Sequence, residues 1–147
     1  MIKTKKRAEL KNKKSFLQVR DDLQNKKTTV RSITANYIKS IHDNKDLNIF
    51  IEVFEKEALS RANEIDEKIK SKNHGKLAGM IIAIKDNLCY ENHLVTASSK
   101  ILKGFKSNYS ATAIEKLLNE DAIIIGRVNC DEFAMGSTNK NLSLIHI

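Results

Sequence analysis

The chain of 147 residues, 41% of them hydrophobic, is long enough to bury a core. No apolar run approaches the roughly 18 residues that cross a bilayer, and no signal-peptide pattern follows Met1. We therefore expect a cytoplasmic protein without a membrane partner. The two cysteines, Cys89 and Cys130, and the four scattered histidines lack the spacing of a metal site, so no metal is expected.

The formal net charge of +8 is concentrated at the N-terminus. Residues 1–20 hold eight lysines and arginines against one acid, Glu9, which gives +7 and leaves +1 for the remainder. A basic arm over residues 1–14 is typical of a solvated tail, and it also fits contact with tRNA or another polyanion. A mitochondrial transit peptide would be richer in arginine, so the cytoplasm is the preferred location.

Residues 15–72 are predicted to form a helical N-terminal segment. Apolar residues at helical spacing predict a short helix from Phe16 that runs out by Lys26. They predict a second helix over residues 30–41, which Thr28 or Thr29 can cap. The run IFIEVF, residues 49–54, fits either a strand or the start of a third helix that continues to about Lys70.

From residue 73 the pattern changes to strands. Residues 80–85 and 122–128 are predicted strands, and residues 94–98 are a possible strand between them. Residues 113–119 are a predicted helix, for which Thr112 and Glu115 have the spacing of a capping box. Strand, helix and strand of these lengths predict a right-handed βαβ unit in a parallel sheet.

The predicted fold class is therefore α/β, with N-terminal helices followed by the first strands of a mixed, mainly parallel sheet that helices cover. A parallel sheet needs several strands, and only two or three are found in this sequence. We therefore expect the front part of a larger domain over residues 73–139, followed by an atypical, truncated tail over residues 140–147.

Lys85 ends the first predicted strand and is the main candidate for chemistry. The apolar run before it predicts a strand buried on both faces, and the carboxyl end of such a strand is where α/β proteins usually place functional groups. Burial there would favour a neutral amine that can act as a base. The alternative is a structural lysine that reaches solvent or pairs with Asp86.

The second candidate segment is GRVNCDEFAMGS, residues 126–137, a strand-to-helix turn that could line a cleft beside Lys85. Asn129 or Asp131 can cap a short helix there. Phe133 is expected to be a core residue, and so is Met135 unless it faces substrate. Cys130 is a poor candidate nucleophile because no nearby histidine supplies a base. The residues expected to line a substrate pocket are Met135, Gly136 and Ser137.

Four segments together resemble the amidase signature family in their order and spacing. They are GKLAGMIIAIKDN, TASSKIL, ATAIEKLLNEDAIIIGRVN and NCDEFAMGSTN, and the resemblance is strong from about Gly75 to Asn139. The motif DEFAMGS favours the tRNA amidotransferase branch of the family. Lys76 and Ile81 stand where the usual strand motif has prolines, and the likeness fades after Thr138.

The resemblance implies that Lys85 is the base of a Ser–cis-Ser–Lys triad. The two serines would lie in a glycine-rich region beyond Ile147, so this fragment alone is expected to be inactive. Ammonia released from glutamine would serve the conversion of Glu-tRNA(Gln) to Gln-tRNA(Gln), and by extension that of Asp-tRNA(Asn). The alternatives are a stand-alone amidase acting on small amides and a non-catalytic adaptor built on the amidase scaffold.

The resemblance also implies partners and cofactors. The partners would be amidotransferase subunits B and C and, through the complex, the misacylated tRNA, with glutamine as the substrate. The amidase chain itself would need no cofactor, whereas its kinase-like partner, the first of these two, would use ATP and Mg²⁺.

Overall fold

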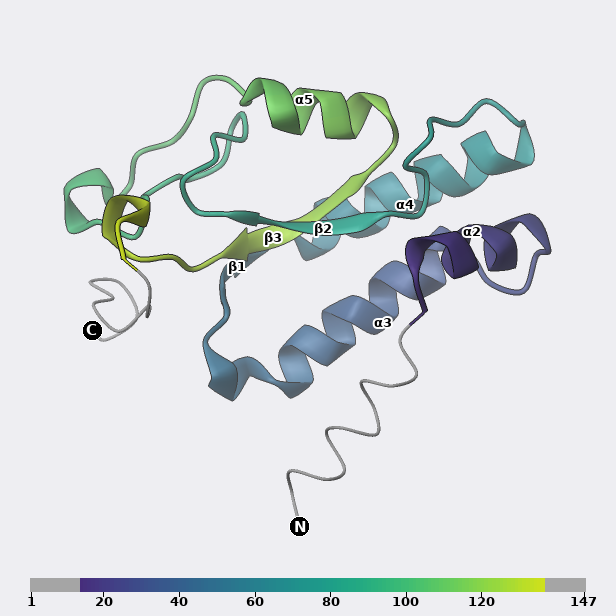
Figure 1. Cartoon of the computed structure of the whole chain (residues 1–147), viewed down its shortest axis with the longest axis horizontal. Helices are drawn as coiled ribbons and strands as arrows, with labels where there is room; N and C mark the ends of the chain where they lie inside the picture. Colours follow the sequence, from purple (N-terminus) through teal and green to yellow (C-terminus); the bar gives the residue numbers. More distant parts are fainter. Residues whose placement is uncertain (1–13, 137–147) are drawn as a thin grey trace, which may run out of the picture.

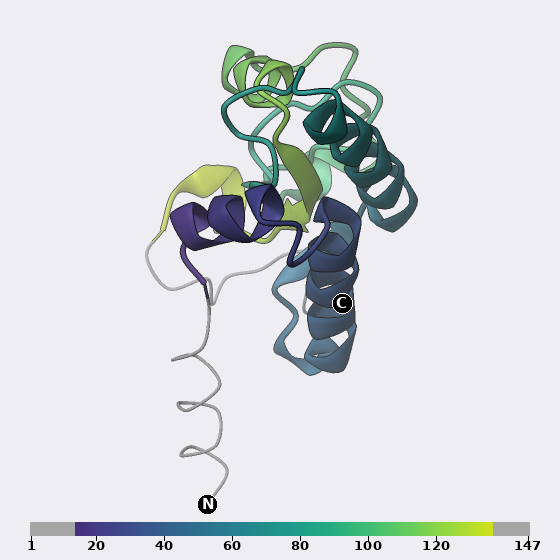
Figure 2. The same cartoon turned by 90° about the vertical axis from the view of Figure 1, so that its right-hand side faces the viewer.

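The computed structural model describes residues 14–136. Most of the predicted basic arm, Ser137 and the tail over residues 140–147 lie outside this range. In chain order the elements are α2 (Phe16–Gln24), α3 (Val30–Asp43), η1 (Lys45–Leu47), β1 (Phe50–Val53), α4 (Glu55–Lys70), β2 (Ile81–Lys85), η2 (Lys100–Leu102), α5 (Thr112–Asn119), β3 (Ile123–Val128) and η3 (Glu132–Ala134). In Figures 1 and 2 a sheet runs through the middle, with α5 on one face and α3 and α4 on the other.

Side-chain caps fix where the N-terminal helices begin. At the start of α2, Ser15 Oγ accepts a hydrogen bond from the N–H of Gln18 at 3.3 Å, and Gln18 Oε1 accepts one from the N–H of Ser15 at 2.7 Å. Thr29, rather than Thr28, caps α3. The Asp66 carboxylate of α4 also accepts two N–H groups from the first turn of α3, at 2.8 and 3.0 Å, and so ties the two helices together.

The ambiguous run IFIEVF forms the strand β1. This strand pairs antiparallel with β3, while β2 pairs parallel with β3, so the strand order is β1-β3-β2. The predicted α/β class with a mixed sheet is therefore confirmed. The parallel pairing of the two strands that flank α5 is confirmed as well.

The expectation that the strand ending at Lys85 is buried on both faces is wrong for the described residues. β3 is the central strand and is buried from Ile123 to Arg127, whereas β2 has one neighbouring strand and both Ala83 and Lys85 are exposed. An apolar run predicts a strand, but it does not tell which strand takes the centre of the sheet.

Two apolar clusters hold the helices to the sheet. On one face, Ile123 and Ile125 of β3 pack in a cluster with buried residues of α2, α3 and α4. On the other face, Ile124 and Ile84 pack against Ile114 of α5. This division follows from the alternation of side chains along a strand.

Two local predictions are wrong. Residues 94–98 form a loop with a single bridge between Leu94 and Lys106, and Ala97 and Ser98 have positive φ angles of 47° and 53°. Helix α5 begins one residue earlier than the capping-box prediction requires. Thr112 is its first residue, and the N-cap position belongs to Ala111, which has no side chain to accept a hydrogen bond.

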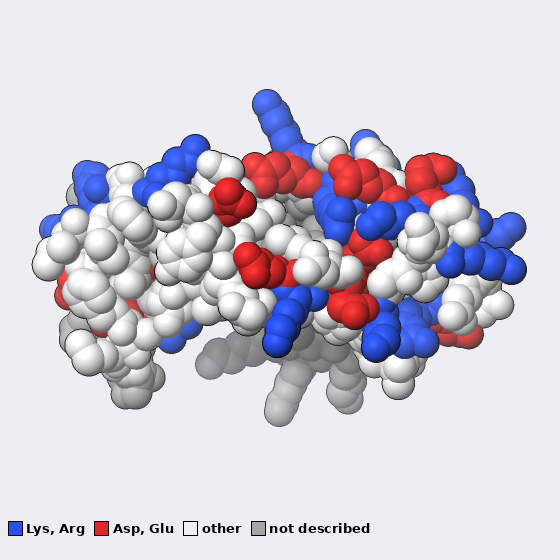
Figure 3. All heavy atoms as spheres, turned by 90° about the horizontal axis from the view of Figure 1, so that it is seen from above, with Lys and Arg blue, Asp and Glu red and all other residues white. Residues whose placement is uncertain are grey.

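Charges are mixed on the face shown in Figure 3. Acidic and basic side chains alternate over the right half of this view, and the left half carries fewer of them. Several of these charges form pairs, including Arg61 with Glu64 and Lys70 with Glu67. None of the helices between residues 14 and 136 is both long and apolar enough to cross a membrane.

Candidate active site

Lys85 is the last residue of β2 and lies opposite Val128 of β3. Because parallel strands end at the same edge of a sheet, Lys85 lies at the carboxyl edge, where functional groups of α/β proteins usually lie. Its side chain is exposed and forms no salt bridge with any residue in the range 14–136. The described residues therefore fix the backbone at Lys85 without removing its amine from solvent.

Asp86, the next residue, is completely buried and does not pair with Lys85. Its carboxylate forms a salt bridge with Arg127 Nη1. It also accepts hydrogen bonds from the N–H of Thr96 at 3.2 Å, from the Thr96 hydroxyl and from the N–H of Ser98 at 3.0 Å. The predicted alternative of a Lys85–Asp86 pair is therefore wrong, because the carboxylate is directed into the protein.

A bulge in β3 explains how Arg127 reaches Asp86. Ile82 of β2 pairs with Ile124, but the next residue, Ala83, pairs with Gly126. β3 thus carries Ile125 as one extra residue at this point. A one-residue shift of register turns every later side chain to the opposite face of the sheet.

Beyond the bulge, Arg127 pairs with Ile84 and so lies on the same face of the sheet as Ile84 and Asp86. Lys85 lies on the opposite face. Arg127 Nη2 also contacts Glu52 Oε2 of β1 at 3.1 Å, while its buried Nε has no partner among the described residues. One guanidinium therefore links the ends of all three strands.

The loop over residues 96–99 wraps around the Asp86 carboxylate. Ser98 is fully buried, and its hydroxyl lies 3.0 Å from Asn129 Oδ1 and 3.3 Å from Cys130 Sγ. The N–H of Ala97 donates to the Asp86 carbonyl oxygen at 2.9 Å. The sequence reasoning missed this role, although a run of small hydroxyl residues is typical of loops that bond to a nearby carboxylate or backbone group.

The segment after β3 packs onto this loop. Ser99 Oγ donates to Glu132 Oε1 at 2.6 Å, and the N–H of Phe133 donates to the Ala97 carbonyl oxygen at 2.8 Å. Asp131 takes the N-cap position of η3 but makes no side-chain capping bond. The segment is thus held beside the Asp86 network through its backbone and Glu132.

The prediction that Phe133 and Met135 fill the core is wrong. Phe133 is 45% exposed and Met135 is 79% exposed. Phe133 has a positive φ of 50°, which turns the chain outward at this point. Met135 and Gly136 lie on the surface at the end of the described range, and the pocket predicted for them and Ser137 stays a prediction.

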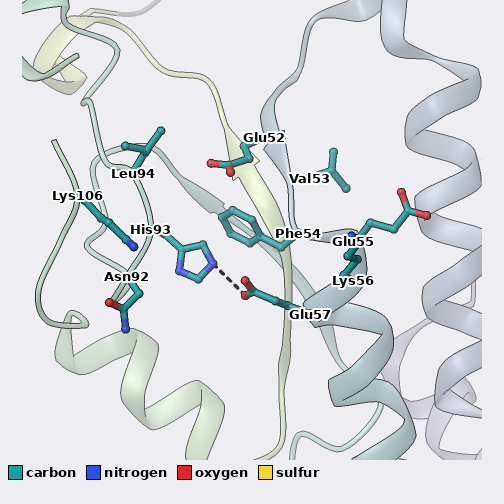
Figure 4. Close-up of a pocket in the computed structure, with 10 residues that line it drawn as sticks. All are labelled: Glu52, Val53, Phe54, Glu55, Lys56, Glu57, Asn92, His93, Leu94 and Lys106. Atoms are coloured by element: carbon teal, nitrogen blue, oxygen red, sulfur yellow. Dashed lines mark hydrogen bonds and ion pairs between the residues drawn. The ribbon is translucent and has the colours of Figure 1, made fainter. Parts of the chain in front are cut away.

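A pocket of about 620 Å³ lies beside the start of α4 (Figure 4). Its lining includes Glu52, Glu57, His93 and Lys106 but not Lys85, so it is separate from the lysine. The His93 ring stacks on Tyr90 at 4.1 Å between centroids, and its Nε2 lies 2.9 Å from Glu57 Oε2. Burial raises the pKa of the Tyr90 hydroxyl, and the Glu57 carboxylate raises it further.

A second buried carboxylate, Asp121, lies at the opposite edge of the sheet, just before β3. It contacts Lys68 Nζ at 2.6 Å, Arg61 Nη2 at 3.0 Å and the N–H of Gly75 at 2.7 Å. Burial raises the pKa of Asp121, but the bonds from Lys68 and Gly75 and the Arg61 charge outweigh it, so that the net pKa is lowered. This pair is structural and remote from Lys85. No three metal-binding side chains gather anywhere in the range 14–136.

The profile of the amidase family matches residues 32–145, which is most of the chain. The chain belongs to the amidase family. The resemblance that its motifs predicted is therefore confirmed. The match includes β1, β2, β3 and Lys85, so the carboxyl edge of the sheet lies within the amidase part of the sequence.

The chain is also similar to curated relatives along most of its length. The A subunit of glutamyl-tRNA(Gln) amidotransferase from Brachyspira hyodysenteriae is 43% identical over 133 residues, which cover 88% of this chain and 28% of that protein. The protein of the same name from Chlorobaculum parvum is 44% identical over 130 residues, covering 88% of this chain and 27% of that protein. The chain thus spans little more than a quarter of the length of these relatives.

A solved structure supports the fold. It belongs to a vestigial protein complex described for the evolutionary origins of an s-triazine catabolic enzyme. The TM-score is 0.82 at 24% identity, and the match covers 87% of this chain and 29% of that one. At this level of identity the likeness shows the fold alone.

Proposed function

We propose that this amidase chain contributes to the hydrolysis of glutamine, with the released ammonia serving the conversion of Glu-tRNA(Gln) to Gln-tRNA(Gln). The observation that carries the proposal is the 43–44% identity to relatives named as the A subunit of glutamyl-tRNA(Gln) amidotransferase. The motif DEFAMGS, which favours this branch, supports the same assignment. A stand-alone amidase acting on small amides, the alternative, has only a likeness of fold behind it.

In this proposal Lys85 acts as a general base. An unprotonated amine would accept the proton of a nucleophilic serine through a bridging serine, and the serine would then attack the amide carbonyl of glutamine. Proton transfer to the departing nitrogen would release ammonia. Both serines would be supplied by a segment outside the residues described, and so would the surface that shields the exposed Lys85 amine from water.

The proposal includes partners that this chain does not contain. We assign amidotransferase subunits B and C as its partners, with the misacylated tRNA, ATP and Mg²⁺ bound through the kinase-like first of these two. The amidase chain is proposed to need no cofactor of its own, because amide hydrolysis by a Ser–cis-Ser–Lys triad uses side chains alone. Asp-tRNA(Asn) would be a second acceptor of the ammonia.

A chimera tests this proposal. In it, this chain replaces the matching 133-residue segment of the Brachyspira hyodysenteriae protein. We expect the chimera to release ammonia from glutamine, and to do so faster than from a small amide such as propionamide. Equal or faster hydrolysis of the small amide would favour the stand-alone amidase. A folded chimera that hydrolyses neither compound would favour the non-catalytic adaptor.

A further inference from the structure

The backbone around Lys85 is fixed by its neighbours rather than by its own side chain. The N–H of Asp86 donates to the Val128 carbonyl oxygen at 3.0 Å, and the Asp86 carbonyl oxygen accepts from the N–H of Ala97 at 2.9 Å. The Lys85 carbonyl oxygen accepts from the N–H of Leu88 at 3.0 Å. These bonds set the direction in which the strand end presents the Lys85 side chain.

The Asp86 carboxylate adds the strongest constraint. It is completely buried, and its donors come from two segments that are distant in sequence, the loop over residues 96–98 and β3. A buried carboxylate with several donors has one favourable position, because any displacement leaves charge and donors unpaired. Residue 86 therefore cannot rotate without breaking the network, and Lys85 moves with it.

Arg127 also keeps the carboxylate away from Lys85. A carboxylate close to an amine favours the protonated form, which cannot accept a proton. The bulge at Ile125 places Arg127 on the face of Asp86, so the guanidinium takes this carboxylate while Lys85 extends from the other face. Two adjacent, oppositely charged residues are thereby prevented from pairing.

We infer that the buried pair of Asp86 and Arg127 positions Lys85 at the carboxyl edge of the sheet and leaves its amine without a carboxylate partner. This inference rests on the proposed function of Lys85 as a base. Asp86 and Arg127 do not touch the substrate in this assignment. They act through Lys85, so their loss should lower kcat more than it raises KM.

The experiment uses the chimera with glutamine as the substrate and compares substitutions of the pair. Asp86→Asn removes the charge, and Arg127→Met removes the cation at similar length. We expect each to lower kcat by about 10- to 100-fold, as a displaced catalytic group does, with KM changed less than about 3-fold. Arg127→Lys should keep most of kcat, since it retains a cation for Asp86 and loses chiefly the contact with the half-exposed Glu52.

Asp121→Asn is the matched control, because it removes a buried charge that also has two basic partners but lies at the other edge of the sheet. It should lower the unfolding temperature to a similar degree as Asp86→Asn and leave kcat unchanged. If Arg127→Met does not fold, Asp86→Asn and Arg127→Lys carry the test. Thermal unfolding followed by circular dichroism identifies the variants that are folded at the assay temperature.

The outcomes separate this inference from the proposed function. If Lys85→Ala abolishes turnover while folded Asp86→Asn retains normal kcat, the pair is structural and the inference is overturned while the function stands. The same holds if Arg127→Lys is as inactive as Arg127→Met. If Lys85→Ala retains turnover, or the parent chimera has none, the proposed function fails and takes the inference with it.

Discussion

Asp86 and Arg127 form a buried salt bridge that joins the ends of two parallel strands, and Lys85 extends from the opposite face of the same strand end. The bridge exists because β3 has one residue more than β2 along their shared length. Without that bulge, Arg127 would lie on the face of Lys85. A backbone irregularity thus decides which charged group is buried and which remains available at the edge.

Gly126, which directly follows the extra residue of the bulge, provides the first prediction. A Cβ at this position would lie 2.5 Å from the Glu52 carbonyl oxygen and 3.0 Å from Phe50 Cδ1, so β1 would have to move. We expect Gly126→Ala to lower the free energy of unfolding by about 1–3 kcal/mol, the usual cost of overpacking. Urea unfolding of the 147-residue chain measures this loss.

Hydrogen exchange locates the effect, with Gly104→Ala as the control. Gly104 has a positive φ of 84° but open space around the missing Cβ, so its substitution strains only the local turn. Amides of β1 should exchange faster in Gly126→Ala and at the normal rate in Gly104→Ala. Unchanged exchange in β1 of the Gly126 variant would contradict the steric argument.

Asp121 provides a prediction about pH. Its pKa in the folded chain lies below the ordinary value of 3.8, mainly because bonds from Lys68 and Gly75 outweigh the effect of burial. The carboxylate therefore stabilises the fold fully above the ordinary value, and this contribution is lost as the pH falls through the lowered pKa. At pH 7 we expect Asp121→Asn to cost about 1.5–3 kcal/mol, typical of hydrogen bonds to a charged group.

Urea midpoints of the parent and Asp121→Asn chains, measured from pH 7 down to pH 2.5, check this expectation. The difference in stability should be constant down to about pH 5 and should shrink below pH 4. Asparagine tolerates the positive φ of 64° at this position, so the substitution tests the charge rather than the backbone. A difference that grew on acidification would show that Asp121 is not stabilised as a carboxylate.

Much of the fold follows from periodicity in the sequence. Apolar residues at helical spacing located α2, α3 and α4, and the two apolar runs located β2 and β3. These signals are local, because each depends on which side chains share one face of a single element. The position of Lys85 at a strand end was predicted for the same reason.

The surroundings of Lys85 could not be predicted in this way. The burial of Asp86 depends on donors from Thr96 and Arg127, which lie 10 and 41 positions away in the sequence. The segment over residues 94–98 was taken for a strand because nothing local indicates that it wraps around a carboxylate. The exposure of β2 follows from the strand order, which is a property of the whole sheet.

The last prediction separates a basic amine at position 85 from a mere positive charge. In the glutamine-hydrolysing chimera, Lys85→Ala should lower kcat by several orders of magnitude without unfolding the protein, because the side chain is exposed and has no salt bridge among the described residues. Lys85→Arg should lower kcat almost as much, since a guanidinium keeps its proton at any working pH and cannot accept another. If the lysine supplied only charge, arginine would replace it well. Rates of ammonia release for the two variants, with circular dichroism as the check on folding, decide between these roles. An arginine variant that keeps more than about a tenth of the parent kcat, a loss in transition-state stabilisation of less than about 1.4 kcal/mol, would contradict the assignment of Lys85 as the base.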